Sequence, residues 1–367
     1  MKGTIQVAKF ANIPVLIHWS FGLIVAWVMY VSYADGSDLK VFLFSLVLIL
    51  SMFCCVVMHE YGHALTARRF GVDTRDIILF PIGGVARLEY LPEKPLEEFY
   101  IAIAGPLVNV AIAVFLSLYF FIDANSWAYI QAFFTEDIEI LEQITSPFQL
   151  FVPLLIGMNL GIALFNMLPA FPMDGGRIFR ALLSLKWSRR RATLIASRLG
   201  QILAVGLFCY GVYNFHPVLP LIGIFIFFVA NSEYKMVKTD ELLKNHTVRD
   251  ISRTDYTKIS YLHKMQKPIS ISQQSQEKSF LVFNELEKIK GVLHKEFIQE
   301  AIQQKAENQY VDEFISPRFT HIQPHLSLKT LHQRMQIEGY SILPVFEYGE
   351  IIGVVDRVGL EAFLKKN

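Results

Sequence analysis

The sequence predicts a polytopic α-helical membrane protein with six transmembrane helices, followed by a smaller soluble α+β domain. The chain of 367 residues is 53% hydrophobic and only 18% charged, whereas soluble domains carry about 25% charged residues. The deficit is uneven, because residues 1–236 hold long apolar runs and residues 237–367 have the composition of a soluble protein. We therefore expect a membrane domain over 1–236, a charged linker over 237–245 and a soluble domain over 246–367.

Six apolar segments have at least the roughly 20 residues that one helix needs to cross a bilayer. They are residues 14–33, 41–65, 98–122, 148–170, 193–213 and 217–236. The fifth segment is the weakest, because it contains Arg198 and Gln201. The first segment is long and is followed by a poor cleavage site, so we expect a retained helix and not a signal peptide.

The distribution of lysine and arginine among the connecting loops predicts the orientation. The loops after the second and fourth segments are rich in both residues, whereas residues 123–147 contain neither and carry five acidic side chains. Positive charge in short loops favours the cytoplasmic side. Both termini should therefore be cytoplasmic, and the ends of the second and fourth segments should meet at the cytoplasmic face.

The stretch "VVMHEYGHAL" (56–65) places ionisable groups at the end of an apolar helix. His59 and His63 are one helical turn apart on one face, the spacing at which two imidazoles share one zinc ion. Glu60 lies about a quarter turn away, where it would take a proton from a zinc-bound water as general base. A charge inside a membrane helix costs about 2.5–3.5 kcal/mol, which favours function over chance occurrence.

A catalytic zinc site needs a third protein ligand at the same end of the bundle. Asp174, in "NMLPAFPMDGGR" (166–177), ends the fourth segment and precedes two glycines that allow a sharp turn. It is the preferred ligand. His18, in "LIHWSF", is the alternative, but we expect a structural hydrogen bond for it.

These paired motifs resemble the site-2 protease family of intramembrane zinc metalloproteases. "PVLIHWSF", "PIGGVARLE" and "GPLVN" resemble further family patterns, and the resemblance covers roughly residues 8–236. It implies one zinc ion on His59, His63 and Asp174, with Glu60 as general base. It also implies that Asn166 binds the substrate or the developing oxyanion. Other polar and glycine positions in the apolar helices are expected to serve helix packing: Asn109, Asn159 and Gly105–Pro106.

The segment "FPIGGVARLEY" (80–90) follows the histidine helix and contains two glycines among alternating aliphatic residues. This pattern predicts a short irregular strand or a re-entrant loop. The edge of such a strand can pair with an extended substrate backbone. That would suit a transmembrane substrate, which must unwind locally before its peptide bond is cleaved.

The C-terminal part contains two similar passages, at approximately 246–305 and 309–365. The second reads as helix, strand "SILPVFE", turn, strand "IIGVV" and helix, and it resembles a CBS repeat. The first is a weaker copy, with "SFLVFNE" and "GVLHKEFIQEAI". We therefore expect a degenerate CBS-like pair that buries its sheets against each other.

CBS pairs commonly sense adenine nucleotides, but the expected ribose-binding side chains are missing here. The family's Ser or Thr after the last strand corresponds to Asp356, and its Asp three residues later corresponds to Gly359. We therefore expect docking or dimerisation, with a homodimer as one outcome, in preference to binding of adenine nucleotide.

We expect an intramembrane zinc endopeptidase in a bacterial or archaeal plasma membrane. Its expected substrate is a single-span membrane protein, such as a membrane-bound transcriptional regulator. A net charge of +1 gives no sign of nucleic-acid binding. A CBS-regulated transporter, an inactive scaffold and another membrane metalloenzyme are the alternatives. Metal content distinguishes them, because a transporter should not lose a tightly bound zinc ion when His59 is changed.

Overall fold

The computed structural model describes residues 3–121 and 147–366, except positions 82, 90, 91, 93, 276 and 318. Between these ranges it describes only residues 128, 131 and 135. The predicted acidic loop at 123–147 therefore lies outside the described residues, apart from those few positions. The chain divides into two compact units, Met1–Tyr234 and Lys235–Asn367.

Five described helices are long and apolar enough to cross a membrane. They are α2 (Leu39–Arg69), α3 (Pro95–Ser117), α6 (Pro147–Asn166), α8 (Arg189–Tyr213) and α9 (Val218–Asn245). They coincide with five of the six predicted segments, although α6 ends four residues before the predicted segment does. A shorter apolar helix spans Trp19–Ala34 and includes α1 (Gly22–Ala34). The count of six membrane-crossing helices stays a prediction.

The first predicted helix begins too early, because residues 14–18 form a strand. This strand, β2 (Ile13–His18), pairs with β1 (Thr4–Phe10) and β3 (Thr74–Phe80). The segment "IPVLIH" is short, and its β-branched side chains suit a pleated surface better than a helix. Apolarity alone did not distinguish it from the helix that follows.

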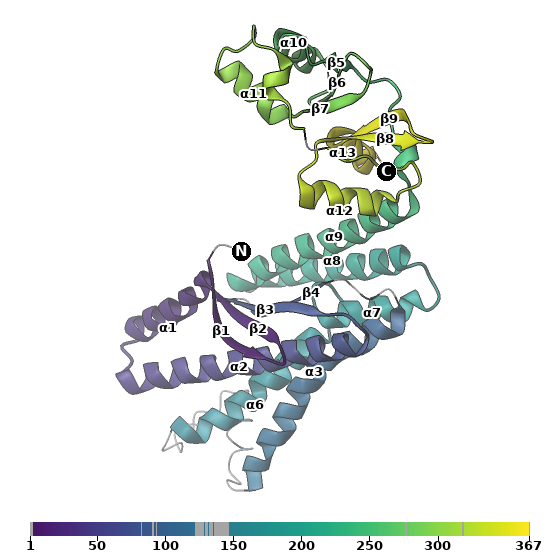
Figure 1. Ribbon diagram of the computed structural model, residues 1–367. Coiled ribbons are helices and arrows are strands. Elements are labelled where there is room, and N and C mark those ends of the chain that lie inside the picture. Colours follow the sequence, from purple (N-terminus) through teal and green to yellow (C-terminus); the bar gives the residue numbers. More distant parts are fainter. Residues whose placement is uncertain are drawn as a thin grey trace. The chain divides into compact units, whose positions relative to one another are not determined.

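The membrane unit contains a four-stranded sheet in the order β1-β2-β3-β4, with β4 at Gly83–Leu88. The β2–β3 pair is parallel, while the outer pairs are antiparallel. Val15 and Leu79 pack with Phe53 of α2, so one face of the sheet is buried against the histidine helix. The predicted strand after this helix is thus confirmed as β4, which forms an edge of the sheet (Figure 1).

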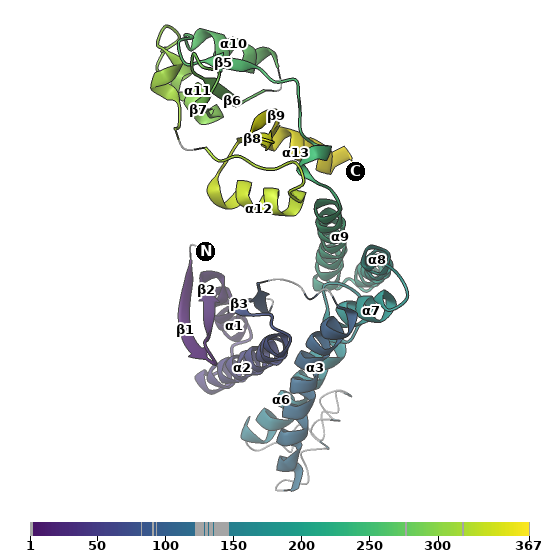
Figure 2. The same cartoon turned by 45° about the vertical axis from the view of Figure 1, so that its right-hand side comes forward.

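The helices that surround α2 bring the two metal motifs to one place. Helix α3 packs against both α2 and α6, and it also packs against α7 (Asp174–Ser184), which lies beside α8 (Figures 1 and 2). Close packing of α2 on α3 requires Gly62, where an added Cβ would lie 2.9 Å from the carbonyl oxygen of Ala104. Residues 167–173, which include Pro169 and Pro172, leave the helical path and turn the chain into α7.

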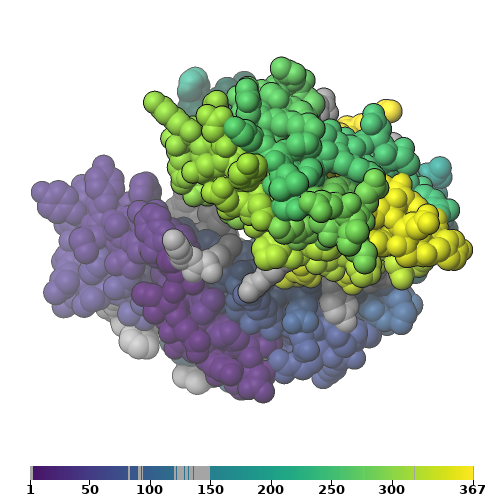
Figure 3. Space-filling model, turned by 45° about the horizontal axis from the view of Figure 1, so that its top comes forward, coloured from purple at the N-terminus to yellow at the C-terminus, as the bar shows by residue number. Residues whose placement is uncertain are grey.

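The C-terminal unit contains the two expected copies. The first has α10 (Gln266–Gln274), α11 (Lys295–Gln303) and the sheet β5-β6-β7 (Lys258–Ser260, Phe280–Phe283, Ile289–Leu293). The second has α12 (Leu328–Glu338), α13 (Arg357–Lys366) and the hairpin β8-β9 (Ile342–Glu347, Glu350–Asp356). Side chains from both sheets share one buried cluster: Leu281, Phe283, Val292, Ile342 and Val354. Figure 3 shows the two copies, green and yellow, side by side.

Residues 237–245, expected as a linker, form the last turns of α9. Their charged composition is that of an exposed helical face, and Leu243 is buried in the core of the second copy. The boundary between the two units, at 234/235, therefore falls inside a continuous helix.

Candidate metal centre

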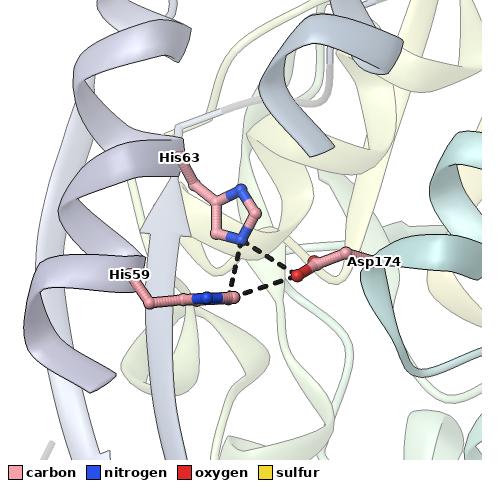
Figure 4. A group of neighbouring side chains, drawn as sticks. All are labelled: His59, His63 and Asp174. Atoms are coloured by element: carbon pink, nitrogen blue, oxygen red, sulfur yellow. Dashed lines mark hydrogen bonds and ion pairs between the residues drawn. The ribbon is translucent and has the colours of Figure 1, made fainter. Parts of the chain in front are cut away.

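The three predicted metal ligands come together from two helices. His59 and His63 lie on one face of α2 and are 4% and 7% exposed. Asp174 is the first residue of α7 and is 9% exposed. Figure 4 shows both imidazole rings and the carboxylate directed toward one another.

The donor atoms of this group have the spacing of a zinc site. His59 Nε2 and His63 Nε2 are 3.1 Å apart, and each lies 3.2 Å from Asp174 Oδ2. Tetrahedral zinc with bonds of about 2.0–2.1 Å separates its ligand atoms by about 3.3 Å. Two imidazole nitrogens and one carboxylate oxygen are also a donor set that zinc accepts. Among the described residues, these three alone form a possible metal-binding group.

Hydrogen bonds behind the rings indicate which nitrogen of each imidazole faces the group. His63 Nδ1 donates to the carbonyl oxygen of Ile101 at 2.7 Å, and His59 Nδ1 contacts the side-chain oxygen of Asn109. Because both partners are acceptors, Nδ1 carries the proton on each ring, and Nε2 presents a lone pair. Two lone pairs and a carboxylate thus converge in a buried space, where a bound cation satisfies all three.

Asn109 is itself oriented by a second buried amide. Its Nδ2 donates to Asn159 Oδ1 at 2.8 Å, and Asn159 Nδ2 donates to the carbonyl oxygen of Leu155 at 2.8 Å. Both asparagines are fully buried. The sequence predicts that both serve helix packing, whereas in the structure the side chain of Asn109 contacts a predicted zinc ligand. A buried amide in an apolar helix was the available signal for this role.

Three glycines allow the close approach of the ligand-bearing elements. A Cβ added to Gly105 of α3 would lie 2.2 Å from His63 Nε2 and 2.7 Å from His59 Nε2. A Cβ on Gly175 or Gly176 would meet the backbone of residues 167–171 at 2.3–2.7 Å. Gly105 therefore leaves room for the metal centre, and the glycine pair after Asp174 lets α7 start against the preceding turn.

Glu60 lies beside the ligands without joining them. Its Oε2 accepts a hydrogen bond from the backbone N–H of Ala86 in β4 at 3.0 Å. Gly84 of the same strand also borders it, because a Cβ there would lie 2.8 Å from Glu60 Cγ. The carboxylate is thus held at the edge of the sheet, next to the histidine that precedes it. Its role as general base stays a prediction.

The two other predicted residues lie apart from the ligand group. His18 Nδ1 is 2.7 Å from Ser20 Oγ and caps a short helical turn, in agreement with the expected structural hydrogen bond. Asn166 is the half-buried last residue of α6, and its side chain makes no hydrogen bond with the residues that the structure describes. Its part in binding substrate stays a prediction.

Arg180, six residues after Asp174, holds α7 in place, a role that the sequence did not predict. Arg180 is fully buried, donates from Nε to Glu98 Oε1 at 2.8 Å, and donates from Nη1 to Glu233 Oε1 at 2.7 Å. These bonds join α7 to α3 and α9. In the sequence, an arginine after a glycine-rich turn resembles an exposed charge. Its partners Glu98 and Glu233 are 82 and 53 positions away, so the pairing could not be recognised.

In the C-terminal unit, the start of α13 is filled by the chain's own carboxylate. Asp356 Oδ1 accepts the backbone N–H of Gly359 at 2.6 Å, and Oδ2 accepts a bond from Arg253 at 2.5 Å. Arg253 also pairs with Glu277 at 3.4 Å. An internal ion pair therefore occupies this helix N-terminus, which is otherwise a favourable place for a bound anion.

Comparison with known proteins places this geometry in a family. The model of peptidase family M50 matches residues 47–207. A zinc metalloprotease from Methanocaldococcus jannaschii is 34% identical over 254 residues, 68% of this chain and 66% of that protein. The chain thus spans just under two thirds of that relative's length. The solved site-2 protease from the same organism is 32% identical and covers 63% of this chain and 95% of its own, with a TM-score of 0.45.

CBS-domain structures are also among the solved structures that match part of this chain. The structure of a CBS-domain-containing protein from Agrobacterium tumefaciens covers 32% of this chain and 91% of its own, at 13% identity and a TM-score of 0.30. The match of the metal motifs, the apolar helices and the identity over the membrane unit agree. The chain is an integral membrane protein that belongs to peptidase family M50, the site-2 protease family.

Proposed function

We propose that this chain is an intramembrane zinc endopeptidase. It hydrolyses a peptide bond within or next to the transmembrane segment of a membrane protein. The observation that carries this proposal is the convergence of three buried acceptor groups, on His59, His63 and Asp174, at the end of an apolar helix that also presents Glu60. A scaffold or a transporter has no need for this combination.

His59, His63 and Asp174 would hold one zinc ion per chain. A zinc ion bound there supplies a Lewis acid that polarises the scissile carbonyl and lowers the pKa of water to about 7. The hydrogen bonds that the two Nδ1–H groups donate to Ile101 and Asn109 keep both rings in the tautomer that leaves Nε2 free.

Glu60 acts as general base and then as general acid. It takes a proton from the attacking water and delivers it to the leaving amine. The bond from Ala86 fixes Oε2, while Oε1 accepts no hydrogen bond from any described residue and remains available for proton transfer. This hydrogen bond therefore orients the base before substrate binds.

The edge of β4 binds the substrate as an added strand. The N–H of Ala86 points to Glu60 and so away from β3, and backbone groups two residues apart face the same side of a strand. The outward backbone groups of Gly84 and the carbonyl oxygen of Ala86 therefore lie beside the proposed catalytic carboxylate, while the N–H of Ala86 is engaged with Glu60. An unwound, extended substrate paired there would have its peptide bonds near Glu60. The amide of Asn166 would assist at the substrate or the oxyanion.

The substrate class is a single-span membrane protein, with a membrane-bound transcriptional regulator as one example. The charge distribution of the loops supports cytoplasmic termini and an active centre near the cytoplasmic face of a bacterial or archaeal plasma membrane. Cleavage there would release the cytoplasmic part of the substrate.

The test compares three full-length variants, purified in detergent with a single-span model substrate. Glu60→Gln should retain one zinc ion per chain and lose cleavage by at least about 10²-fold, because the amide cannot accept the proton. Asp174→Asn should lose both zinc and cleavage. Glu89→Gln, which changes an exposed carboxyl just after β4, is the matched control and should keep both.

Zinc content measured by elemental analysis separates the possible results. Zinc in the wild type that disappears on changing Asp174, with cleavage that depends on Glu60, supports the protease. A wild type that neither binds zinc nor cleaves any single-span substrate would leave the transporter or the inactive scaffold. Full cleavage by Glu60→Gln would remove Glu60 from the mechanism.

A further inference from the structure

Helix α8 has two opposite faces. Its buried face consists of small side chains, Ala192, Ala196, Gly200 and Ala204. Opposite it runs a stripe of exposed residues: Arg191, Ile195, Arg198, Ile202 and Val205. At about 100° per residue, the centres of the two faces are about 180° apart. The outer face is therefore the one that this integral membrane protein presents to lipid.

Arg198 stands inside this apolar stripe and has no partner among the residues that the structure describes. Ile195 and Ile202, its neighbours along the stripe, are 39% and 68% exposed. The guanidinium makes no hydrogen bond or ion pair with any residue that the structure describes, and the same is true of Arg191. An unpaired charge at membrane depth is costly, so a partner other than the described residues would stabilise it.

The position of Arg198 along α8 places its guanidinium near the polar headgroups of the membrane. The apolar part of the helix, 193–213, has about the length of a 30 Å hydrocarbon core, and Arg198 lies five residues, or about 7.5 Å, inside it. Helical side chains lean toward the helix N-terminus, and a long arginine side chain can extend by this route to the polar interface. Its guanidinium then reaches the level of the lipid phosphates.

Neighbouring groups at the start of α8 complete a site for an anionic headgroup. Arg191 lies on the same stripe, seven residues and about 10.5 Å toward the interface. Lys186 and Trp187 in the preceding turn are exposed, and exposed tryptophan is typical of the membrane interface. The exposed charged side chains at this end of α8, Lys186, Arg191 and Arg198, are all positive. A guanidinium group binds a phosphate through two parallel hydrogen bonds.

We propose that Arg198 and Arg191 form a binding site for the phosphate of an anionic phospholipid, in the leaflet that contains the α7–α8 turn. The acyl chains lie along Ile195, Ile202 and Val205, and the headgroup lies between the two guanidinium groups and Trp187. This site is independent of the proposed proteolysis, and its test does not use activity.

The experiment measures lipid binding to the full-length protein in detergent by native mass spectrometry and thermal unfolding. Phosphatidylglycerol should bind and raise the unfolding temperature, whereas phosphatidylcholine and inorganic phosphate should not. Arg198→Gln should weaken phosphatidylglycerol binding about tenfold or more, because a charged, bidentate contact is lost. Arg198→Lys should fall between the two, because its charge remains and the paired geometry does not.

Arg69→Gln is the matched control, because Arg69 is an exposed arginine at the end of α2. It should leave phosphatidylglycerol binding unchanged. Equal loss in both variants would mean unspecific charge attraction and would overturn the proposal. Unchanged binding in a folded Arg198→Gln protein would do the same. A dimer that dissociates in Arg198→Gln would show that a second copy, and not a lipid, covers this stripe.

Discussion

Asn109 is the residue through which the helix bundle orients His59, one of the three proposed zinc ligands. Its side-chain oxygen contacts His59 Nδ1, and its amide group is fixed by Asn159. We expect Asn109→Ala to weaken zinc binding about 10- to 100-fold, because the ring then loses the acceptor that selects its tautomer. Competition with a chelator of known affinity, followed by zinc fluorescence, measures this loss.

Asn109→Asp separates orientation from packing. The carboxylate keeps an acceptor for His59 at the same place, and carboxylate–histidine pairs occur behind many zinc sites. Zinc affinity should therefore return toward that of the wild type, although the bond to Asn159 changes. Equal loss in Asn109→Ala and Asn109→Asp would show that this residue serves packing alone.

Gly105 tests whether the space beside the histidines is required. An added methyl group would lie 2.2 Å from His63 Nε2. We expect Gly105→Ala to abolish zinc binding and to lower the unfolding temperature. Gly161→Ala, inside α6, is the matched control, because a Cβ there meets nothing within 4 Å. It should keep zinc and gain up to about 1 kcal/mol of helix stability.

The roles of some residues at the proposed metal centre could be predicted from the sequence, and those of others could not. His59 and His63 could be predicted because their spacing equals one helical turn, and Asp174 because its segment ends on the same side as theirs. Asn109 could not be assigned, since its partner lies 50 positions away and only the packing of α3 on α2 brings them together. The contact of Glu60 with Ala86 likewise depends on the register of β4.

Prediction at the scale of elements succeeded where periodicity and length agreed. The long helices α2, α3, α8 and α9 were predicted because each contains a mostly apolar stretch of about 20 residues. Residues 14–18 were misassigned, because a buried strand and a membrane helix are both continuous apolar runs. The helical extension to Asn245 was also missed, since charged side chains on an exposed helical face resemble a linker.

Arg180 holds α7 against α3 and α9 through buried ion pairs with Glu98 and Glu233. We expect Arg180→Met to lower the free energy of unfolding by about 3–5 kcal/mol, because Glu233 and Glu98 lose their buried counter-charge and only Glu98 keeps a second, more distant partner, Arg189 at 3.6 Å. It should also weaken zinc binding, since Asp174 begins the same helix. Chemical unfolding in detergent, together with zinc titration, measures both effects.

Lys94→Gln is the comparison for this ion-pair network. Lys94 and Glu97 form an exposed pair at 2.9 Å in the same unit, and such pairs contribute only about 0–1 kcal/mol. Unfolding of this variant should therefore match the wild type. If Arg180→Met unfolds like Lys94→Gln and binds zinc normally, the buried network does not position α7.

At the scale of the whole molecule, two units of different chemistry share one helix. The membrane unit contains buried polar groups at the proposed metal centre and around Arg180, while the C-terminal unit has ordinary aliphatic cores in each copy. Its two copies meet at a shared cluster and at a hydrogen bond of 2.7 Å between His294 Nδ1 and Ser341 Oγ. This seam contains a titratable group, which makes the stability of the unit depend on pH.

Burial lowers the pKa of His294 below its ordinary value, and the nearby charge of Glu296 opposes this only in part. The unfolded chain then binds a proton more readily than the folded one. The contribution of His294 to stability is therefore complete above the ordinary histidine pKa of about 6.5 and falls as the pH drops through it. Thermal unfolding of the full chain between pH 7.5 and pH 5.5 should show a less stable C-terminal unit at the acidic end.

Burial and the charge of Lys267 lower the pKa of His263 as well, so His294 is accompanied by a second such group in the described part of this unit. His294→Gln isolates one of them and should make the loss of stability on acidification smaller. His325→Gln, at an exposed position of the same unit, should leave the pH dependence unchanged. Since protonation of His294 acts where the two copies meet, the effect should be accompanied by faster hydrogen exchange in β8, which contacts β6 across the seam. Identical pH profiles for the wild type and His294→Gln would exclude His294 as a source of this dependence.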